Sequence, residues 1–412
     1  MRGVLLGGSN SVFDNGLVSG LRANCDLERL SLGATSCAQN LFEIVRNSEK
    51  IKSADVVVTE SNVNDSFNFS LMGLELDFVL AQIDEFYLQL STLTHKVYVV
   101  VLPINIHLPG VEPVEIVSSI NNRHVKNCLH HGFRLVDVSD SAKGLNKQDA
   151  MNLIPHARHL NEAIQHQIAV NICEHVKANP FIERPLPNPV AEYAIVTAGD
   201  LPVVGAREKK NSRFNEVVYD LECRIKFPSG FEGWRIKAAA TWSDGYSILK
   251  LSSSAQKVSK AFQDAIMVVE FVDEVVVDGS TFIESSCDNV RASEKTPLVS
   301  YVDGQQPGPV GLIAFLVRRG SIPSVVLAEN YTFEDVKCSA IVPNLVPFAR
   351  SFQTWLNLNK VVSRAKYDAL FASVSNLSGQ IESIVKTGKL FVSGYISFWV
   401  MDAMAEVAVV FG

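Results

Sequence analysis

The sequence predicts two architectures in one chain, an α/β sandwich followed by a β-rich region. In roughly the first 175 residues, short runs of Val and Leu alternate with longer amphipathic stretches. Strands that are apolar along their whole length are typical of a parallel sheet covered by helices on both faces. Beyond about residue 190 the hydrophobic period changes to two, as in antiparallel strands with one buried face. These observations predict an α/β fold class with a second, sandwich-like β region that contains some helix.

Short apolar runs that alternate with amphipathic stretches define the predicted sandwich. Strands are expected at residues 3–6, 27–32, 56–59, 97–102 and 133–138. Helices are expected at residues 36–48, 71–93 and 114–131, and after His159. Five strands with intervening helices favour a doubly wound, flavodoxin-like α/β/α sandwich with three layers and a five-stranded parallel sheet.

A proline-rich stretch follows the last predicted helix. Four prolines lie within ten residues, at Pro180, Pro185, Pro187 and Pro189. Such a stretch can form neither a helix nor a central strand, so it is typical of a semi-rigid linker. We therefore expect domains at residues 1–178 and 191–412, joined by a linker at residues 179–190.

The β-rich region carries its own strand and turn signals. Residues 219–227 alternate apolar with charged side chains and predict one half-buried strand. Asp244-Gly245 and Asp278-Gly279 each separate two such runs, which predicts hairpin turns. From about residue 343 to 386 the pattern becomes helical, before a final apolar run.

Five aromatic residues of this region leave two interpretations open. They are Trp234, Trp242, Tyr246, Trp355 and Trp399, and they include all four tryptophans of the chain. Buried rings would fill a core, whereas exposed rings would suit stacking on a glycan. We expect any single ring to be a core residue.

Composition argues against several classes of protein. The net charge of -7, without a Lys/Arg block, argues against nucleic acid as a partner. Seven scattered cysteines without a C-x-x-C pair argue against disulfides and a zinc knuckle, and favour a reducing, cytoplasmic location. Residues 390–412 are interrupted by Asp402 and Glu406, so we expect no membrane anchor. We expect no metal and no bound cofactor, and the oligomeric state stays open.

Chemistry-bearing residues concentrate in the first half of the chain. All nine histidines lie between His95 and His175, and histidine is the usual proton carrier near neutral pH. In an open parallel sheet, ligands bind beyond the carboxyl ends of the strands. The loops there contain Gly7-Gly8-Ser9-Asn10-Ser11, Gly33-Ala34, Asn62-Val63-Asn64-Asp65 and His156-Ala157-Arg158-His159.

These four blocks, in this order, resemble the SGNH, or GDSL, hydrolase superfamily. The resemblance implies that Ser9 is the nucleophile, with Gly8 where the family has Asp. It implies an oxyanion hole formed by the Ser9 backbone, Gly33 and Asn64, with Ala34 in place of Gly33 if the register shifts by one. His159 matches the catalytic histidine. These types fit ester chemistry, because an imidazole can activate a hydroxyl and N–H donors can stabilise an oxyanion.

One departure concerns the third member of a catalytic triad. His156 stands where the family has Asp, and it cannot supply the carboxylate that normally orients the imidazole. Asp149 is the first candidate for that role and Asp140 a weaker one. Otherwise His156 or a backbone carbonyl would orient His159 in a Ser/His dyad. Glu60 and Asp65 flank the site, and we expect them to be solvated loop carboxylates.

The expected function is a serine-dependent hydrolase that removes a small acyl group, acetyl above all, from a carbohydrate or glycoconjugate. An O-acetyltransferase that takes the acyl group from a donor such as acetyl-CoA is the alternative, since nucleophile and oxyanion hole serve both reactions. A third hypothesis is a catalytically impaired glycan-binding protein, which the missing Asp motivates.

Overall fold

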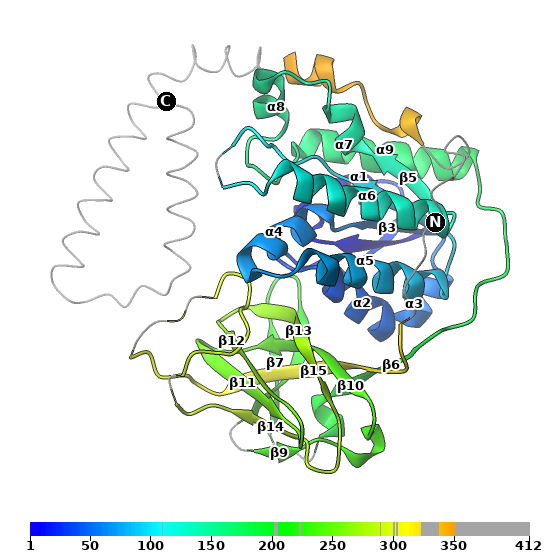
Figure 1. The fold of residues 1–412 in the computed structure, drawn as a ribbon. Coiled ribbons are helices and arrows are strands. Elements are labelled where there is room, and N and C mark those ends of the chain that lie inside the picture. Colours follow the sequence, from blue (N-terminus) through cyan, green and yellow to red (C-terminus); the bar gives the residue numbers. More distant parts are fainter. Residues whose placement is uncertain are drawn as a thin grey trace. The chain divides into compact units, whose positions relative to one another are not determined.

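A computed structural model of the chain describes residues 1–108, 110–201, 205–221, 224–288, 290–299, 301, 304–322 and 338–350 (Figure 1). Within it, Met1–Ala349 forms one compact unit. Most of the helical stretch predicted at residues 343–386 lies outside the described residues, as do the final apolar run, Trp355 and Trp399.

A five-stranded parallel sheet forms the centre of the first half of the chain. The strands are β1 Arg2–Gly7, β2 Asp26–Arg29, β3 Val56–Glu60, β4 Val97–Val101 and β5 Arg134–Asp137, in the spatial order β2-β1-β3-β4-β5. All neighbours pair in parallel. The five strands and their parallel arrangement confirm the prediction. Because the chain leaves β1 for β2 and returns to β3 on the other side, the switch point lies between β1 and β3.

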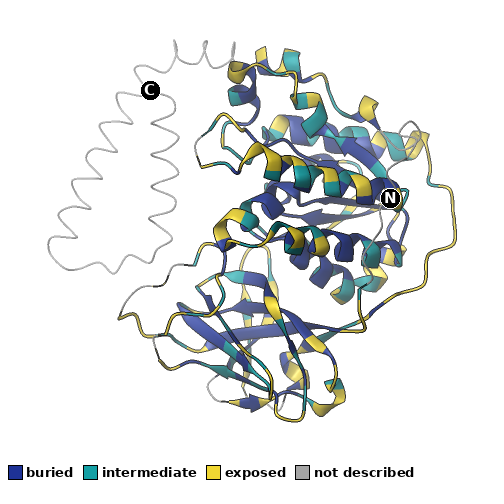
Figure 2. Ribbon diagram, in the orientation of Figure 1, coloured by how far each residue is buried: buried dark blue, intermediate teal, exposed yellow. Residues whose placement is uncertain are grey.

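Helices cover both faces of this sheet. They are α1 Leu17–Arg22, α2 Cys37–Arg46, α3 Ser48–Ser53, α4 Asn62–Met72, α5 Leu76–Ser91, α6 Val114–His130, α7 Val138–Ala142, α8 Lys147–Leu153 and α9 Glu162–Ala178. On one face, Val4 and Leu6 pack with α2, α5 and α6, and on the other Leu5 packs with α1 and α9. Figure 2 shows the sheet buried between these helices. The three-layer sandwich is therefore confirmed.

The helix limits depend on local capping. The Ser36 side chain accepts a hydrogen bond from the Ala38 backbone N–H and so starts α2. The helix predicted at residues 71–93 begins only at Leu76, because Gly73 ends α4 in the left-handed conformation (φ 63°). The short helices α1, α3, α4, α7 and α8 were not predicted.

Two antiparallel sheets form the β-rich region, as predicted. One has the order β13-β10-β15-β8-β7, with β6 also paired to β15, and the other has the order β12-β11-β14-β9. The strands are β6 Glu192–Thr197, β7 Ala206–Lys210, β8 Asn215–Leu221, β9 Ile225–Lys226, β10 Arg235–Trp242, β11 Ser247–Ser252, β12 Lys257–Phe262, β13 Ile266–Val276, β14 Phe282–Ser285 and β15 Val310–Arg319. Both sheets contribute to one hydrophobic core. Trp234, Trp242 and Tyr246 are buried, as expected of core residues.

Two local predictions for this region are wrong. The strand expected at residues 219–227 is divided between β8 in the larger sheet and β9 in the smaller one. The Asp244-Gly245 and Asp278-Gly279 turns join β10 to β11 and β13 to β14, which also belong to different sheets. The turn residues reverse the chain, but the strands on either side diverge to opposite layers instead of pairing as hairpins.

The two architectures meet along a continuous buried surface. Hydrophobic residues of the larger sheet, including Ala238, Val268 and Leu316, share one core cluster with α2 and α5. Residues 180–189 contain no helix or strand, as expected of a linker. That the two parts are separate domains stays a prediction. No helix in the described ranges combines the length and apolar character needed to cross a membrane.

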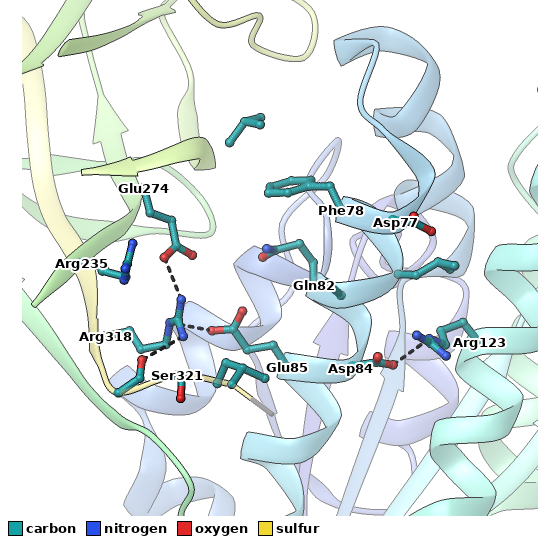
Figure 3. A pocket seen from close by; sticks show the side chains of 15 residues that line it. Asp77, Phe78, Gln82, Asp84, Glu85, Arg123, Arg235, Glu274, Arg318 and Ser321 are labelled. Carbon is teal, nitrogen blue, oxygen red and sulfur yellow. Dashed lines mark hydrogen bonds and ion pairs between the residues drawn. The ribbon is translucent and has the colours of Figure 1, made fainter. Parts of the chain in front are cut away.

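Four charged residues meet at this junction, three of them buried and Glu274 half-buried. Lys237 of β10 is 1% exposed, and its Nζ lies 2.6 Å from Glu85 Oε2 of α5 and 3.3 Å from Glu274 Oε1 of β13. Arg318 Nη2 of β15 lies 2.7 Å from Glu274 Oε2. Figure 3 shows Arg318 between the two carboxylates, at one side of a cavity of about 750 Å³. We call Glu85, Lys237, Glu274 and Arg318 the junction cluster.

Candidate active site

The turn after β1 places Ser9 at the switch point of the sheet. Gly8 follows β1, and Ser9–Ser11 forms one 3-10 turn. A Cβ on Gly8 would lie only 2.3 Å from Cγ of Asn64, so glycine is required here for the Asn64 amide to reach the backbone. Ser9 itself is half-buried and remains accessible from solvent.

A buried carboxylate holds this turn in place. Glu60, the last residue of β3, accepts hydrogen bonds at Oε1 from Gly8 N (3.1 Å), Ser11 N (3.0 Å) and Ser11 Oγ (2.8 Å). Burial raises the pKa of Glu60 to about 8, although these hydrogen bonds oppose the shift. The expectation that Glu60 is a solvated loop carboxylate is wrong, because the side chain bonds to the turn after β1 and is almost completely buried.

His159 lies next to Ser9, although 150 residues separate them in the sequence. Its Nε2 is 3.1 Å from Ser9 Oγ. The His159 ring packs edge-on against Phe13, with centroids 5.0 Å apart. Its backbone N–H donates to the His156 carbonyl at 2.6 Å, which closes a tight turn between the two histidines. The structure therefore brings together the two residues predicted as nucleophile and base, and their catalytic roles stay predictions.

Asn10 fixes the loop that carries His159. Its Nδ2 donates to the carbonyl of Arg158 at 3.0 Å, and its Oδ1 accepts from the N–H of Leu160 at 3.2 Å. Asn10, the residue after Ser9, thus forms hydrogen bonds with the backbone on both sides of His159. Oδ1 also accepts from Gln165 Nε2 at 3.1 Å. Asn10 was not predicted as a site residue.

Asn64, in the first turn of α4, completes the contacts of Ser9. Its Oδ1 accepts hydrogen bonds from Ser9 N at 3.1 Å and from Ser9 Oγ at 3.0 Å. Among the described residues its Nδ2 has no hydrogen-bond partner, and the atom is buried. Two groups predicted for the oxyanion hole, the Ser9 N–H and the Asn64 side chain, therefore bond to each other in this structure. The Asn64 amide nitrogen, beside Ser9, donates to no acceptor among the described residues.

Gly33 and Ala34 form the turn after β2, beside the Ser9 turn. Ser31 Oγ donates to the carbonyl of Ser11 at 2.7 Å, which ties the two turns together. Gly33 is half-buried, and a Cβ there would meet only Val12, at 3.9 Å. Ala34 has a positive φ of 57°, which is uncommon for a residue with a side chain. The role of either N–H in an oxyanion hole stays a prediction.

The residues considered for orienting His159 lie on the same side of the fold. Asp149, in the first turn of α8, is 9% exposed and accepts from Asn146 Nδ2 at 2.7 Å. His156 is exposed, and its ring centroid lies 6.4 Å from that of His159. The backbone carbonyl of His156 accepts a hydrogen bond from the His159 N–H. The roles of Asp149 and of the His156 ring stay predictions.

Solved structures resemble part of this chain. The lipase/acylhydrolase from Enterococcus faecalis matches with a TM-score of 0.36 and 11% identity, over 45% of this chain and 100% of that one. The acetyl xylan esterase AlAXEase matches with a TM-score of 0.35 and 15% identity, over 44% and 100%. Axe2, an acetylxylan esterase from Geobacillus stearothermophilus, matches with a TM-score of 0.33 and 13% identity, over 44% and 94%. No protein-family model matches the chain, and no curated protein matches it.

Behind Asn64, the carboxylate of Asp65 faces the interior instead of solvent. It is 1% exposed, so the expectation that Asp65 is solvated is wrong. Its Oδ1 accepts from the backbone N–H of Cys37 at 2.8 Å, at the start of α2. Asp65 therefore connects the helix that carries Asn64 to the helix that follows the Gly33 turn.

Proposed function

We propose that this chain is a serine-dependent ester hydrolase that forms an acyl-enzyme on Ser9. The observation that carries the proposal is the 3.1 Å distance between Ser9 Oγ and His159 Nε2 at the carboxyl end of the parallel sheet. A hydroxyl within hydrogen-bond reach of an imidazole is the arrangement that activates a serine nucleophile. Both side chains are half-buried and accessible to a substrate.

In the first half of the proposed reaction, the Ser9 hydroxyl turns its proton from Asn64 Oδ1 to His159 Nε2. Ser9 Oγ then attacks the ester carbonyl carbon while His159 Nε2 takes that proton. The carbonyl oxygen becomes an oxyanion. When the tetrahedral intermediate collapses, the C–O bond to the alcohol breaks and His159 gives its proton to the leaving oxygen. In the second half, water loses a proton to His159 and attacks the acyl carbon. The bond from that carbon to Ser9 Oγ then breaks, the acid leaves, and His159 returns the proton to Ser9 Oγ.

Asn64 is the oxyanion donor that the contacts favour. Within the described part of the chain, its buried Nδ2 has no acceptor, and a buried polar group of this kind costs free energy until it is paired. An oxyanion beside Ser9 would supply the acceptor. Ser9 N–H would then exchange Asn64 Oδ1 for the same oxyanion, with Gly33 as the third proposed donor.

For the group that orients His159 we propose Asp149, with a Ser/His dyad supported by the His156 carbonyl as the alternative. Asp149 is nearly buried, so a carboxylate there would stabilise the protonated imidazole more strongly than an exposed one. The 2.6 Å hydrogen bond from His159 N–H to His156 already fixes the backbone of the histidine. The acyl group that we propose is acetyl, and the alcohol part is a carbohydrate or glycoconjugate.

The test uses the full chain with p-nitrophenyl acetate, p-nitrophenyl octanoate and acetylated oligosaccharides. We expect turnover of the acetyl ester, covalent labelling of Ser9 by a fluorophosphonate probe, and loss of both in Ser9→Ala and His159→Ala. Ser53→Ala is the matched control, since this exposed serine ends α3, away from the site. Absence of labelling in the folded wild-type protein would contradict the proposal. Acetyl transfer from acetyl-CoA to an oligosaccharide, without release of acetate, would support the transferase instead.

A further inference from the structure

Three buried side chains of different chemistry meet behind the Ser9 site. They are Cys37, the first residue of α2, Asp65 in the first turn of α4, and His124 in α6. Cys37 is 0% exposed, and Asp65 and His124 are each 1% exposed. We call these three residues the buried donor cluster.

The potential ligand atoms of the buried donor cluster converge on one point. Cys37 Sγ lies 3.2 Å from Asp65 Oδ2, and His124 Nε2 lies 3.0 Å from the same oxygen. One ligand atom from each residue lies within 4.8 Å of the other two. Zinc–ligand distances of about 2.0–2.3 Å in a tetrahedral site place ligand atoms roughly 3.3–3.7 Å apart. An ion therefore requires Cys37 Sγ and His124 Nε2 each to move away from Asp65 Oδ2 by only a few tenths of an ångström.

The donor set also balances charge. A thiolate and a carboxylate carry two negative charges, which a divalent cation neutralises, and the imidazole adds no charge. Sulfur, nitrogen and oxygen donors together suit zinc better than the all-oxygen sites of magnesium and calcium. A neutral assembly is what a fully buried site requires, since an uncompensated charge there is costly.

The surrounding contacts resemble an outer shell of a metal site. Tyr87 of α5 is buried, and its hydroxyl lies 2.9 Å from His124 Nδ1, the nitrogen that would not bind the ion. Asp65 Oδ1 accepts a hydrogen bond from the Cys37 backbone N–H at 2.8 Å, which an ion on Oδ2 would leave in place. Ser61 Oγ lies 3.1 Å from Cys37 Sγ and supplies a fourth polar atom. Outer contacts of this kind fix the tautomer and orientation of metal ligands.

We propose that Cys37, Asp65 and His124 bind a zinc-type divalent cation, with Ser61 Oγ as the neighbouring oxygen in the fourth position. On binding, the Cys37 thiol loses its proton to solvent, and Sγ binds as the thiolate. The His124 proton then resides on Nδ1 and is donated to the Tyr87 hydroxyl, while Nε2 binds the ion. The ion joins α2, α4 and α6 and takes no part in ester chemistry.

Without an ion, the same atoms form a hydrogen-bonded cluster. The Cys37 thiol and His124 Nε2–H would then both donate to Asp65 Oδ2. The two arrangements differ in metal content, in the charge of Cys37 and in the effect of a chelator on refolding. The site is closed to solvent, so the ion is expected to enter during folding and to exchange slowly from the folded protein.

The experiment is metal analysis of the full chain, purified from medium supplemented with zinc and, separately, refolded with zinc or cobalt. We expect about one equivalent of zinc per chain. The cobalt form is expected to show the near-ultraviolet charge-transfer band of a thiolate–cobalt bond. Refolding with a chelator is expected to lower the melting temperature, and added zinc during refolding to restore it.

Variants assign the ligands. Cys37→Ser and His124→Gln are expected to lose the cobalt band and most of the bound zinc. Cys128→Ser is the matched control, since Cys128 is equally buried in α6 but lies outside the buried donor cluster. Wild-type protein with less than about a tenth of an equivalent of zinc, no cobalt band and a melting temperature unaffected by zinc during refolding would overturn the proposal. None of these readouts depends on ester hydrolysis by Ser9.

Discussion

The Ser9 site and the junction cluster use buried polar groups in opposite ways. Around Ser9, hydroxyls, amides and backbone groups supply most of the contacts, and Asn10, Glu60 and Asn64 fix the geometry through hydrogen bonds of 2.8–3.2 Å. At the junction cluster, two carboxylates and two cations contact one another directly. Hydrogen bonds to amides specify direction, whereas ion pairs mainly compensate buried charge.

This difference predicts separable effects of mutation. Loss of a group near Ser9 leaves an imperfectly placed nucleophile in a folded protein, so activity should fall more than stability. Loss of one charge from the junction cluster leaves its partners buried without compensation, so stability should fall more than activity. Each variant below is therefore measured for both quantities.

The largest loss of stability is expected from Lys237→Ala. Lys237 is 1% exposed, and removal of its charge leaves Glu85 and Glu274 with an ion pair to Arg318 and, at Glu85, the hydrogen bond from the Tyr193 hydroxyl. We expect the free energy of unfolding to fall by about 3–5 kcal/mol in guanidinium titrations. The kcat for p-nitrophenyl acetate should stay within about threefold where the variant is folded. Lys52→Ala, which removes an exposed ion pair within α3, is the control. A loss below about 1 kcal/mol for Lys237→Ala would contradict the prediction that Lys237 compensates the charges of Glu85 and Glu274.

The next effect is expected from Asn64→Ala, measured on kcat. Removal of one oxyanion donor, here Asn64 Nδ2, typically lowers kcat about 100- to 1000-fold even where the others remain, and KM should change much less. Asn68→Ala is a close control, because Asn68 is also buried and lies one turn further along α4. Equal losses of kcat in the two variants would show that Asn64 supports the helix and not the reaction.

A smaller loss of activity is expected from Asn10→Ala. Asn10 touches neither the substrate carbonyl nor the hydroxyl of Ser9 in the proposed reaction, but it holds the backbone on both sides of His159. A displacement of His159 by about 1 Å would lower kcat by up to about 100-fold. Because Ser9 and His159 remain, fluorophosphonate labelling should be slower but still complete. Complete loss of labelling, as in His159→Ala, would contradict a positioning role.

The sequence predicted the parallel sheet and its covering helices, and it paired Ser9 with His159, which the structure places in contact. Short runs rich in Val and Leu predicted all five parallel strands, although the run at residues 27–32 also contains Glu28 and Arg29, and the order of the blocks paired Ser9 with His159. The roles of Asn10 and Glu60 could not be predicted, because their partners lie 148 and 52 residues away and depend on which strand ends meet. The diverging turns at Asp244 and Asp278 were missed for a similar reason: a turn signal specifies a reversal of the chain but not the sheet that the next strand joins.

The last effect is a slope, smaller per pH unit than the losses above, in the pH dependence of stability, and Glu60 is the residue that tests it. Burial raises its pKa from an ordinary value of 4.5 to about 8, so between these values the folded chain holds a proton that the unfolded chain has released. Stability attributable to Glu60 should therefore decrease as pH rises through this range, by up to about 1.4 kcal/mol per pH unit.

Glu60→Gln removes this titration while it keeps an oxygen that can accept the hydrogen bonds of Gly8 and Ser11. We expect the slope of unfolding free energy against pH to become flatter between about pH 5 and 7.5, with the largest gain in stability near pH 8. Burial also raises the pKa of Glu43, to about 7, so the wild-type slope contains both residues and only the difference between the two proteins reports on Glu60. The exposed Glu49→Gln is the control and should leave the slope unchanged. If Glu60→Gln has the wild-type slope, Glu60 is ionised in the folded protein, and its three hydrogen bonds outweigh the cost of its burial.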